Sequence, residues 1–341
     1  MKAKNCQIIK KEINIGISIL RVILSLMVVL DHFYNAKKMK KYYSILYYHI
    51  PTFFVISFYY NYKTLTSFNS SKIKSRFKRI LIPYFSWCTI SWMINNIYYH
   101  ILKKKCRHSF RDYLINLMNG HIFLVPLWFQ NNLFLLTLVF TIIIFLFKNK
   151  YIYILNILSL LAIISQYSGF NYTFFTHHFQ RHTYLSLGRF TEAFPNAFIG
   201  FFIAKFDLIN NIEKKKIISL FSFIILMIIT KYNIFSNLKT FKYGGIRLNV
   251  AATCIFIIFS LLPFQKIKNK LLINGLIKIT NYTAGIYFTH YLIGHEFFFE
   301  LLLKDKRDTF LGCIIIYFVS YCASFIGSKL FRKTIFRHLF A

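Results

Sequence analysis

An arginine and a histidine share one side of the first long apolar segment, residues 15–34. Arg21 and His32 are eleven positions apart, which on an α-helix is about three turns, so both side chains point to nearly the same side, roughly 16 Å apart along the axis. A guanidinium binds anions, and an imidazole titrates near neutral pH and can accept a proton. Such groups are costly inside a membrane, and we therefore interpret this pair as functional.

A second basic pair precedes the third apolar segment. Arg76 and Arg79 are three positions apart, which makes them neighbours on one helix face, and Pro83 follows inside the apolar segment. Two guanidinium groups side by side suit a phosphate or pyrophosphate group. From the residues alone, the alternative is that both arginines are ordinary flanking charges of a transmembrane helix.

Two more pairs have the spacing of neighbours on a helix. Tyr287 and His290 can share a face, where they line a site or serve only in packing. Arg189 and Glu192 can form a buried ion pair, or Arg189 can provide a second contact for an anion.

No metal site is predicted. His177, His178 and His182 are close in sequence, but a metal needs a further ligand, and no Asp or Glu lies nearby. The six cysteines show no paired spacing, so we predict neither a disulfide framework nor a cysteine-based metal site.

The composition indicates a polytopic helical membrane protein. Of 341 residues, 56% are hydrophobic and 20% are aromatic. They fall in blocks of about 18–25 residues, the length that spans a bilayer. The formal net charge is +33, and its Lys and Arg residues lie mainly between the blocks, where they contact anionic membrane lipids. No soluble domain stands apart to bind nucleic acid, and we exclude nucleic acid as a partner.

We therefore predict an all-α transmembrane bundle of about ten spans, forming one domain over residues 1–341. Short loops between spans suit antiparallel neighbours, and neither an internal repeat nor a linker divides the chain. An even number of spans puts both termini on one side, and a modest excess of Lys and Arg assigns that side to the cytoplasm. The predicted spans are 15–34, 44–63, 80–101, 122–147, 151–168, 183–204, 216–235, 247–264, 280–303 and 309–331.

Five segments, in order along nearly the whole chain, resemble the membrane acyltransferase-3 family. The most specific parts are the Arg-x10-His pattern of Arg21 and His32 and the Arg-x-x-Arg pattern of Arg76 and Arg79. The five segments are 17–33 (ISILRVILSLMVVLDHF), 50–60 (IPTFFVISFYY), 76–85 (RFKRILIPYF), 126–136 (PLWFQNNLFLL) and 284–293 (AGIYFTHYLI).

The chain also departs from the family's pattern. The glycine that commonly follows the double Phe is absent, because Phe54 is followed by Val55, Ile56 and Ser57. The acidic residue that many relatives carry soon after the WxL motif is missing after Trp128. We expect no additional hydrolase-like domain after the bundle.

The resemblance implies an acyl, usually O-acetyl, transferase that acts on cell-surface glycans. The implied donor is acetyl-CoA, a substrate rather than a permanently bound cofactor. Arg21, Arg76 and Arg79 would bind this donor, and His32 would act as general base or as an acyl relay.

The implied acceptor is a glycan hydroxyl or its lipid-linked precursor, as in capsule, O-antigen or exopolysaccharide. Trp128, Arg189, Glu192, Tyr287 and His290 are candidates for lining the acceptor side. The implied location is the bacterial cytoplasmic (inner) membrane.

Two other functions remain open from sequence. One is a polysaccharide exporter or flippase without acyl chemistry, which would be expected to have two similar halves. The other is a member that binds glycan without turnover.

Overall fold

The described residues of the computed structural model form helices and connecting turns, with no β-strand among them. They are 14–34, 47–102, 109–119, 127–168, 181–211, 213–232, 245–262, 269–294, 309–334 and 339. The predicted all-α class is confirmed. Helices are expected for apolar segments of this length, because a helix satisfies its own backbone hydrogen bonds in an apolar environment.

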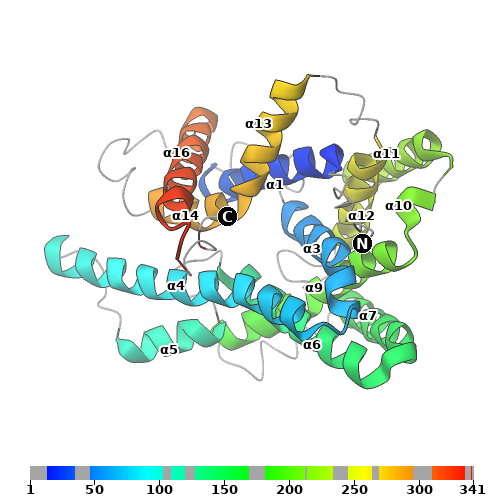
Figure 1. The fold of residues 1–341 in the computed structure, drawn as a ribbon, viewed down its shortest axis with the longest axis horizontal. Coiled ribbons are helices and arrows are strands. Elements are labelled where there is room, and N and C mark those ends of the chain that lie inside the picture. Colours follow the sequence, from blue (N-terminus) through cyan, green and yellow to red (C-terminus); the bar gives the residue numbers. More distant parts are fainter. Residues whose placement is uncertain are drawn as a thin grey trace, which may run out of the picture.

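Three helices build the first part of the bundle. They are α1 (Ile15–Phe33), α3 (His49–Thr66) and α4 (Ser70–Leu102). Figure 1 shows α1 and α4 running in roughly the same direction, with α3 between them. Each of the two outer helices begins at an asparagine cap. The side-chain oxygen of Asn14 accepts from the backbone of Ile17, and that of Asn69 accepts from the backbone of Ser71.

The remaining helices cover the other predicted apolar segments, and those at 110–119, 208–211 and 270–279 form outside them. They are α5 (Phe110–Asn119), α6 (Leu127–Phe147), the short 3₁₀ turn η2 (Lys148–Lys150), α7 (Tyr151–Tyr167), α9 (Arg181–Lys205), α10 (Leu208–Asn211), α11 (Lys215–Lys231), α12 (Ile246–Leu261), α13 (Lys270–Asn281), α14 (Thr283–Leu292) and α16 (Phe310–Leu330).

Two predicted segments differ from the helices that form. The segment predicted at 80–101 belongs to a helix that begins at Ser70, so Arg76 lies on the same continuous helix as Pro83. The segment predicted at 280–303 begins within the last two residues of α13 and contains α14, and the two helices meet at Tyr282, where the helical backbone is interrupted at φ −102° and ψ 3°. Residues 295–303 lie outside the described part of the chain.

Three helical stretches are long and apolar enough to cross a membrane, judged on the described residues by length and composition. They are Ile15–Phe33, Leu127–Tyr167 and Phe310–Leu330, and Ile246–Leu261 is apolar but shorter. The count of about ten spans therefore stays a prediction.

Apolar side chains also cover outward-facing surfaces. On α7 and α11, Ile164 and Phe221 are 60% and 62% exposed, respectively. Large apolar faces that point outward are typical of helices that contact lipid.

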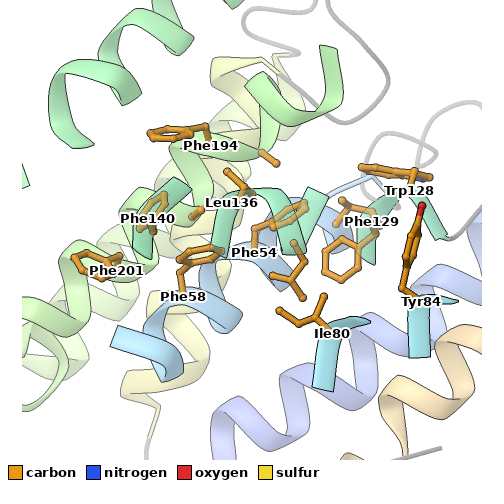
Figure 2. Packing of buried hydrophobic residues seen from close by; sticks show 14 of the residues in the cluster. Phe54, Phe58, Ile80, Tyr84, Trp128, Phe129, Leu136, Phe140, Phe194 and Phe201 are labelled. Atoms are coloured by element: carbon orange, nitrogen blue, oxygen red, sulfur yellow. The ribbon is translucent and has the colours of Figure 1, made fainter. Parts of the chain in front are cut away.

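The largest hydrophobic core joins α3, α4, α6, α7, α9 and α14. Figure 2 shows aromatic rings through this core, with Trp128 and Tyr84 toward one end and Phe201 toward the other. The helices α3 and α9 cross closely at Gly200. A Cβ atom there would lie 2.8 Å from the carbonyl carbon of Val55, so only glycine fits this approach.

A smaller cluster joins α1, α14 and α16. Val29 and Phe33 pack with Ile286 and Cys313, and all four are buried. This packing fixes the end of α1 against α14, which brings His32 close to the residues of the 284–293 segment.

Candidate active site

Arg76 is bound to the neighbouring helix α3. Its Nη2 donates to Ser57 Oγ at 2.8 Å, while its Nε is buried without a hydrogen-bond partner among the described residues. Burial lowers the pKa of Arg76 to about 10, and the positive charge of Arg79 is the smaller cause. The group stays charged at neutral pH, and a half-buried guanidinium with unused donor capacity can bind an anion.

Arg21 is hydrogen-bonded to the start of α14. Its Nη2 donates to Thr283 Oγ1 at 3.0 Å, at the first residue of α14. Arg21 also lies close to Tyr60 of α3. The hydrogen bond to Thr283 therefore holds the arginine at the start of α14, with α3 beside it.

The helix α3 connects the two arginines. Ser57 contacts Arg76, and Tyr60, one turn further along α3, is near Arg21. The structure thus brings Arg21 and Arg76 to neighbouring positions around α3, although they come from different helices.

Arg79 is more open. It is exposed, and its Nη2 makes a long contact of 3.4 Å with Ser75 Oγ on its own helix. Arg79 therefore presents a second charge at the surface, three residues along the helix from the half-buried Arg76.

His32 lies in a group of rings from α1 and α14. Its ring centroid is 5.2 Å from that of His290 and 5.7 Å from that of Tyr291, which it meets edge-on at 84°. His290 is fully buried, and its Nδ1 lies 3.0 Å from the carbonyl oxygen of Ile286. The predicted residues His32 and His290 are thus brought together.

Aromatic contacts continue from this group toward α6. The ring centroid of Tyr287 is 6.1 Å from that of His290 and 5.4 Å from that of Phe129. Phe129 in turn lies 4.6 Å from Phe54 of α3. Tyr287 is buried between the histidine group and α6.

Trp128 and Arg189 are stacked. The guanidinium carbon of Arg189 lies 4.4 Å from the ring centroid of Trp128, which is a cation–π contact between α9 and α6. Trp128, Arg189 and Glu192 line a small cavity of about 10 Å³, roughly the space of one water molecule. Glu192 of α9 thus places a carboxylate in the same cavity as Trp128.

A network of amide side chains supports this cavity. Asn196 lines it, and its Nδ2 donates to Asn249 Oδ1 at 2.7 Å. Gln166 Oε1 accepts from Asn249 Nδ2 at 3.3 Å and from the backbone nitrogen of Gly245 at 3.1 Å. The network joins α7, α9 and α12, and Asn196 Oδ1 has no hydrogen-bond partner among the described residues.

Five polar residues around the candidate site were not predicted as site residues from the sequence: Ser57, Thr283, Asn196, Gln166 and Asn249. Each is a polar residue inside or beside an apolar helix, which is the signal that identifies such positions. In the described part of the chain, no group of three or more His, Cys, Asp or Glu residues could hold a metal. His177 and His178 lie outside that part, as does the side chain of His182.

The fold and the site define a helical membrane protein that holds arginines and a histidine within its helices. The family model for an acyltransferase domain, that of the acyltransferase-3 family, matches residues 14–331. The chain belongs to this family and is a membrane acyltransferase. No curated protein and no solved structure matches the chain.

Proposed function

We propose that this membrane acyltransferase is an O-acetyltransferase that moves acetyl from cytoplasmic acetyl-CoA to a hydroxyl of a cell-surface glycan or its lipid-linked precursor. The observation that carries the proposal is the Arg76 guanidinium, which keeps a buried donor unused beside Ser57. A nucleotide phosphate would use this donor, because guanidinium groups bind phosphate oxygens through paired hydrogen bonds.

The arginines account for donor binding. Arg76 and Arg79 bind phosphates of the nucleotide, and Arg21 binds the donor further along. Arg21 supports this assignment because it is anchored to α14 and faces the same helix α3 as Arg76. The roughly 16 Å of helix between Arg21 and His32 suits an extended arm that ends in a thioester.

His32 then performs the proton transfer. It accepts the proton of the acceptor hydroxyl while the hydroxyl oxygen bonds to the thioester carbonyl carbon. The carbon–sulfur bond breaks, and the CoA thiolate takes the proton back from His32. The residues equally permit a relay, in which His32 carries the acetyl group between donor and acceptor.

The acceptor side is formed by Trp128, Arg189, Glu192 and Tyr287. A cavity of about 10 Å³ fits a hydroxyl group but not a sugar ring, so a sugar would bind only after α6 and α9 separate at this end. The proposed location is the bacterial inner membrane, with both termini cytoplasmic. Capsule, O-antigen and exopolysaccharide are all suitable acceptors.

The proposal is tested by reconstituting the purified protein in liposomes with acetyl-CoA labelled in its acetyl group. The acceptor is the surface glycan extracted from cells that lack this protein. We expect label in the glycan that mild base removes, as an O-ester requires. A glycan without label, although the protein binds CoA, would contradict O-acetyl transfer.

A further inference from the structure

We propose that His290 positions His32 for catalysis, by accepting a hydrogen bond from one ring nitrogen of His32 while the other nitrogen faces the acceptor hydroxyl. This inference rests on the proposed function of His32 as general base. It assigns to His290 a role in the reaction that is distinct from lining the acceptor side.

A backbone carbonyl determines the tautomer of His290. Its Nδ1 lies 3.0 Å from the carbonyl oxygen of Ile286. A carbonyl oxygen can only accept, so Nδ1 must carry the hydrogen. The neutral ring of His290 therefore presents Nε2 as a hydrogen-bond acceptor.

The rings of His32 and His290 lie close together. The centroids of His32 and His290 are 5.2 Å apart, with an angle of 35° between the ring planes. His290 Nε2 makes no hydrogen bond to His32 in the orientation that the structure shows. At this separation, facing nitrogens of two imidazoles reach hydrogen-bond distance once the His32 ring turns about its side-chain torsions. An acceptor on His290 then selects the His32 tautomer whose hydrogen points toward it, and leaves a lone pair on the opposite nitrogen.

The His290 ring is held by the packing around it. His290 is fully buried, and the site around it is closed by packed rings. Phe33 lies 6.2 Å from His290, and Tyr291 meets His32 edge-on. Gly294 lies against the Phe33 ring so closely that a Cβ atom there would overlap it. The His290 ring thus has a fixed orientation, which a positioning residue requires.

The proton balance of this arrangement is simple. When His32 takes the acceptor proton it becomes an imidazolium, and both of its nitrogens carry hydrogen. The hydrogen already directed at His290 remains there, and its bond becomes charge-assisted and stronger. The hydrogen taken from the acceptor leaves with CoA. His290 thereby stabilises the charged state of His32 without exchanging a proton itself, as an orienting residue does in other acid–base sites.

Two substitutions separate this role from simple packing. His290→Gln keeps an oxygen near the position of Nε2 and can still accept from His32. His290→Asn keeps a donor to the Ile286 carbonyl but has no group that reaches His32. Both variants are assayed in liposomes with labelled acetyl-CoA and with surface glycan extracted from cells that lack the protein.

We expect kcat of His290→Asn to fall on the order of 10- to 100-fold, a part of what a general base contributes. The KM for acetyl-CoA and the affinity for CoA should not change, because His290 lies away from the arginines. His290→Gln should recover a large part of kcat. If His290→Asn does not reach the membrane, His290→Gln compared with His290→Leu gives the same contrast.

The outcomes distinguish this inference from the proposed function. If the wild type transfers acetyl and His32→Ala does not, but His290→Asn has wild-type kcat, the role of His290 is wrong and the proposed function stands. Equal losses in His290→Asn and His290→Gln, together with lost CoA binding, would indicate a structural role and overturn the inference. A wild-type protein without transfer would overturn both.

Discussion

Arg76 of α4 donates a hydrogen bond of 2.8 Å to Ser57 of α3, and this contact links the charged start of α4 to the middle of the preceding helix. The same helix α3 brings Tyr60 close to Arg21 of α1. Two arginines that are far apart in sequence therefore face one region, and the predictions on donor binding follow from this arrangement.

Replacing Arg76 by alanine should weaken CoA binding. A hydrogen bond to a charged group contributes about 1.5–3 kcal/mol, which corresponds to a roughly 10- to 150-fold rise in Kd. The measurement is the titration of CoA into protein held in lipid nanodiscs. Arg79→Ala should have a smaller effect that weakens further as salt is added, because Arg79 is exposed.

Lys78→Ala is the matched control for this titration. Lys78 is an exposed cation on the same helix, between the two arginines in sequence. A Kd that rises equally in Lys78→Ala would mean that general positive charge attracts CoA. Unchanged Kd values in Arg76→Ala and Arg79→Ala would contradict the assignment of the donor site.

Replacing Gly200 by valine should destabilise the bundle. The added side chain would overlap the Val55 backbone and force α3 and α9 apart, and overpacking of this kind costs about 1–3 kcal/mol or more. The readout is the apparent Tm of the detergent-solubilised protein, measured by size-exclusion chromatography after heating.

Gly275→Ala provides the contrast. A Cβ atom at Gly275 meets no atom within 4 Å, and the residue lies inside α13, where alanine favours the helix by about 0.5–1 kcal/mol. This variant should have an unchanged or higher Tm. If Gly200→Val were as stable as Gly275→Ala, the close crossing of α3 and α9 would be wrong.

Replacing Gln166 by leucine should also lower the Tm. Gln166 joins three helices through Asn249, Gly245 and the backbone oxygen of Thr191, and its loss leaves buried polar groups without partners. Each such group costs about 1–3 kcal/mol. Tyr167→Phe, at the exposed neighbouring position, should leave the Tm unchanged. Equal Tm values for the two variants would argue against the amide network.

Arg189 gives a prediction for the acceptor side. The stacking of Arg189 on Trp128 is a contact of about 0.5–2 kcal/mol that depends on the planar guanidinium. We expect Arg189→Met to raise the KM for the glycan acceptor more than Arg189→Lys does, and both to leave the Kd for CoA unchanged. A change in the CoA Kd, with an unchanged acceptor KM, would indicate that Arg189 contacts the donor and not the acceptor.

The sequence predicts the helices better than it predicts the site. Apolar length determines segments such as 15–34 and 151–168, and the structure has Ile15–Phe33 and Tyr151–Tyr167 there. The start of α4 was missed because residues 70–79 are polar and carry no apolar signal. Helical spacing relates Arg21 to His32 along α1, since that relation depends on local geometry alone.

The contacts between side chains of different helices could not be predicted from the sequence. Ser57 and Thr283 bind arginines of other helices, and no spacing rule relates residues from different helices. The pairing of His32 with His290 depends on the packing of α1 against α14, and so on side-chain shapes that a linear pattern does not encode. The resemblance to the family identified the candidate site residues, and the packing of the helices shows which residues they contact.

The central claim is acetyl transfer that depends on His32, and surface-glycan O-acetylation tests it most directly. Glycan is examined by NMR, before and after base treatment, in cells that lack the protein and in the same cells complemented with wild type or His32→Ala. O-acetyl signals should return with wild type alone, at equal membrane levels of both proteins. Equal O-acetylation in all strains, with surface polymer lost in the deletion, would contradict the claim and indicate export.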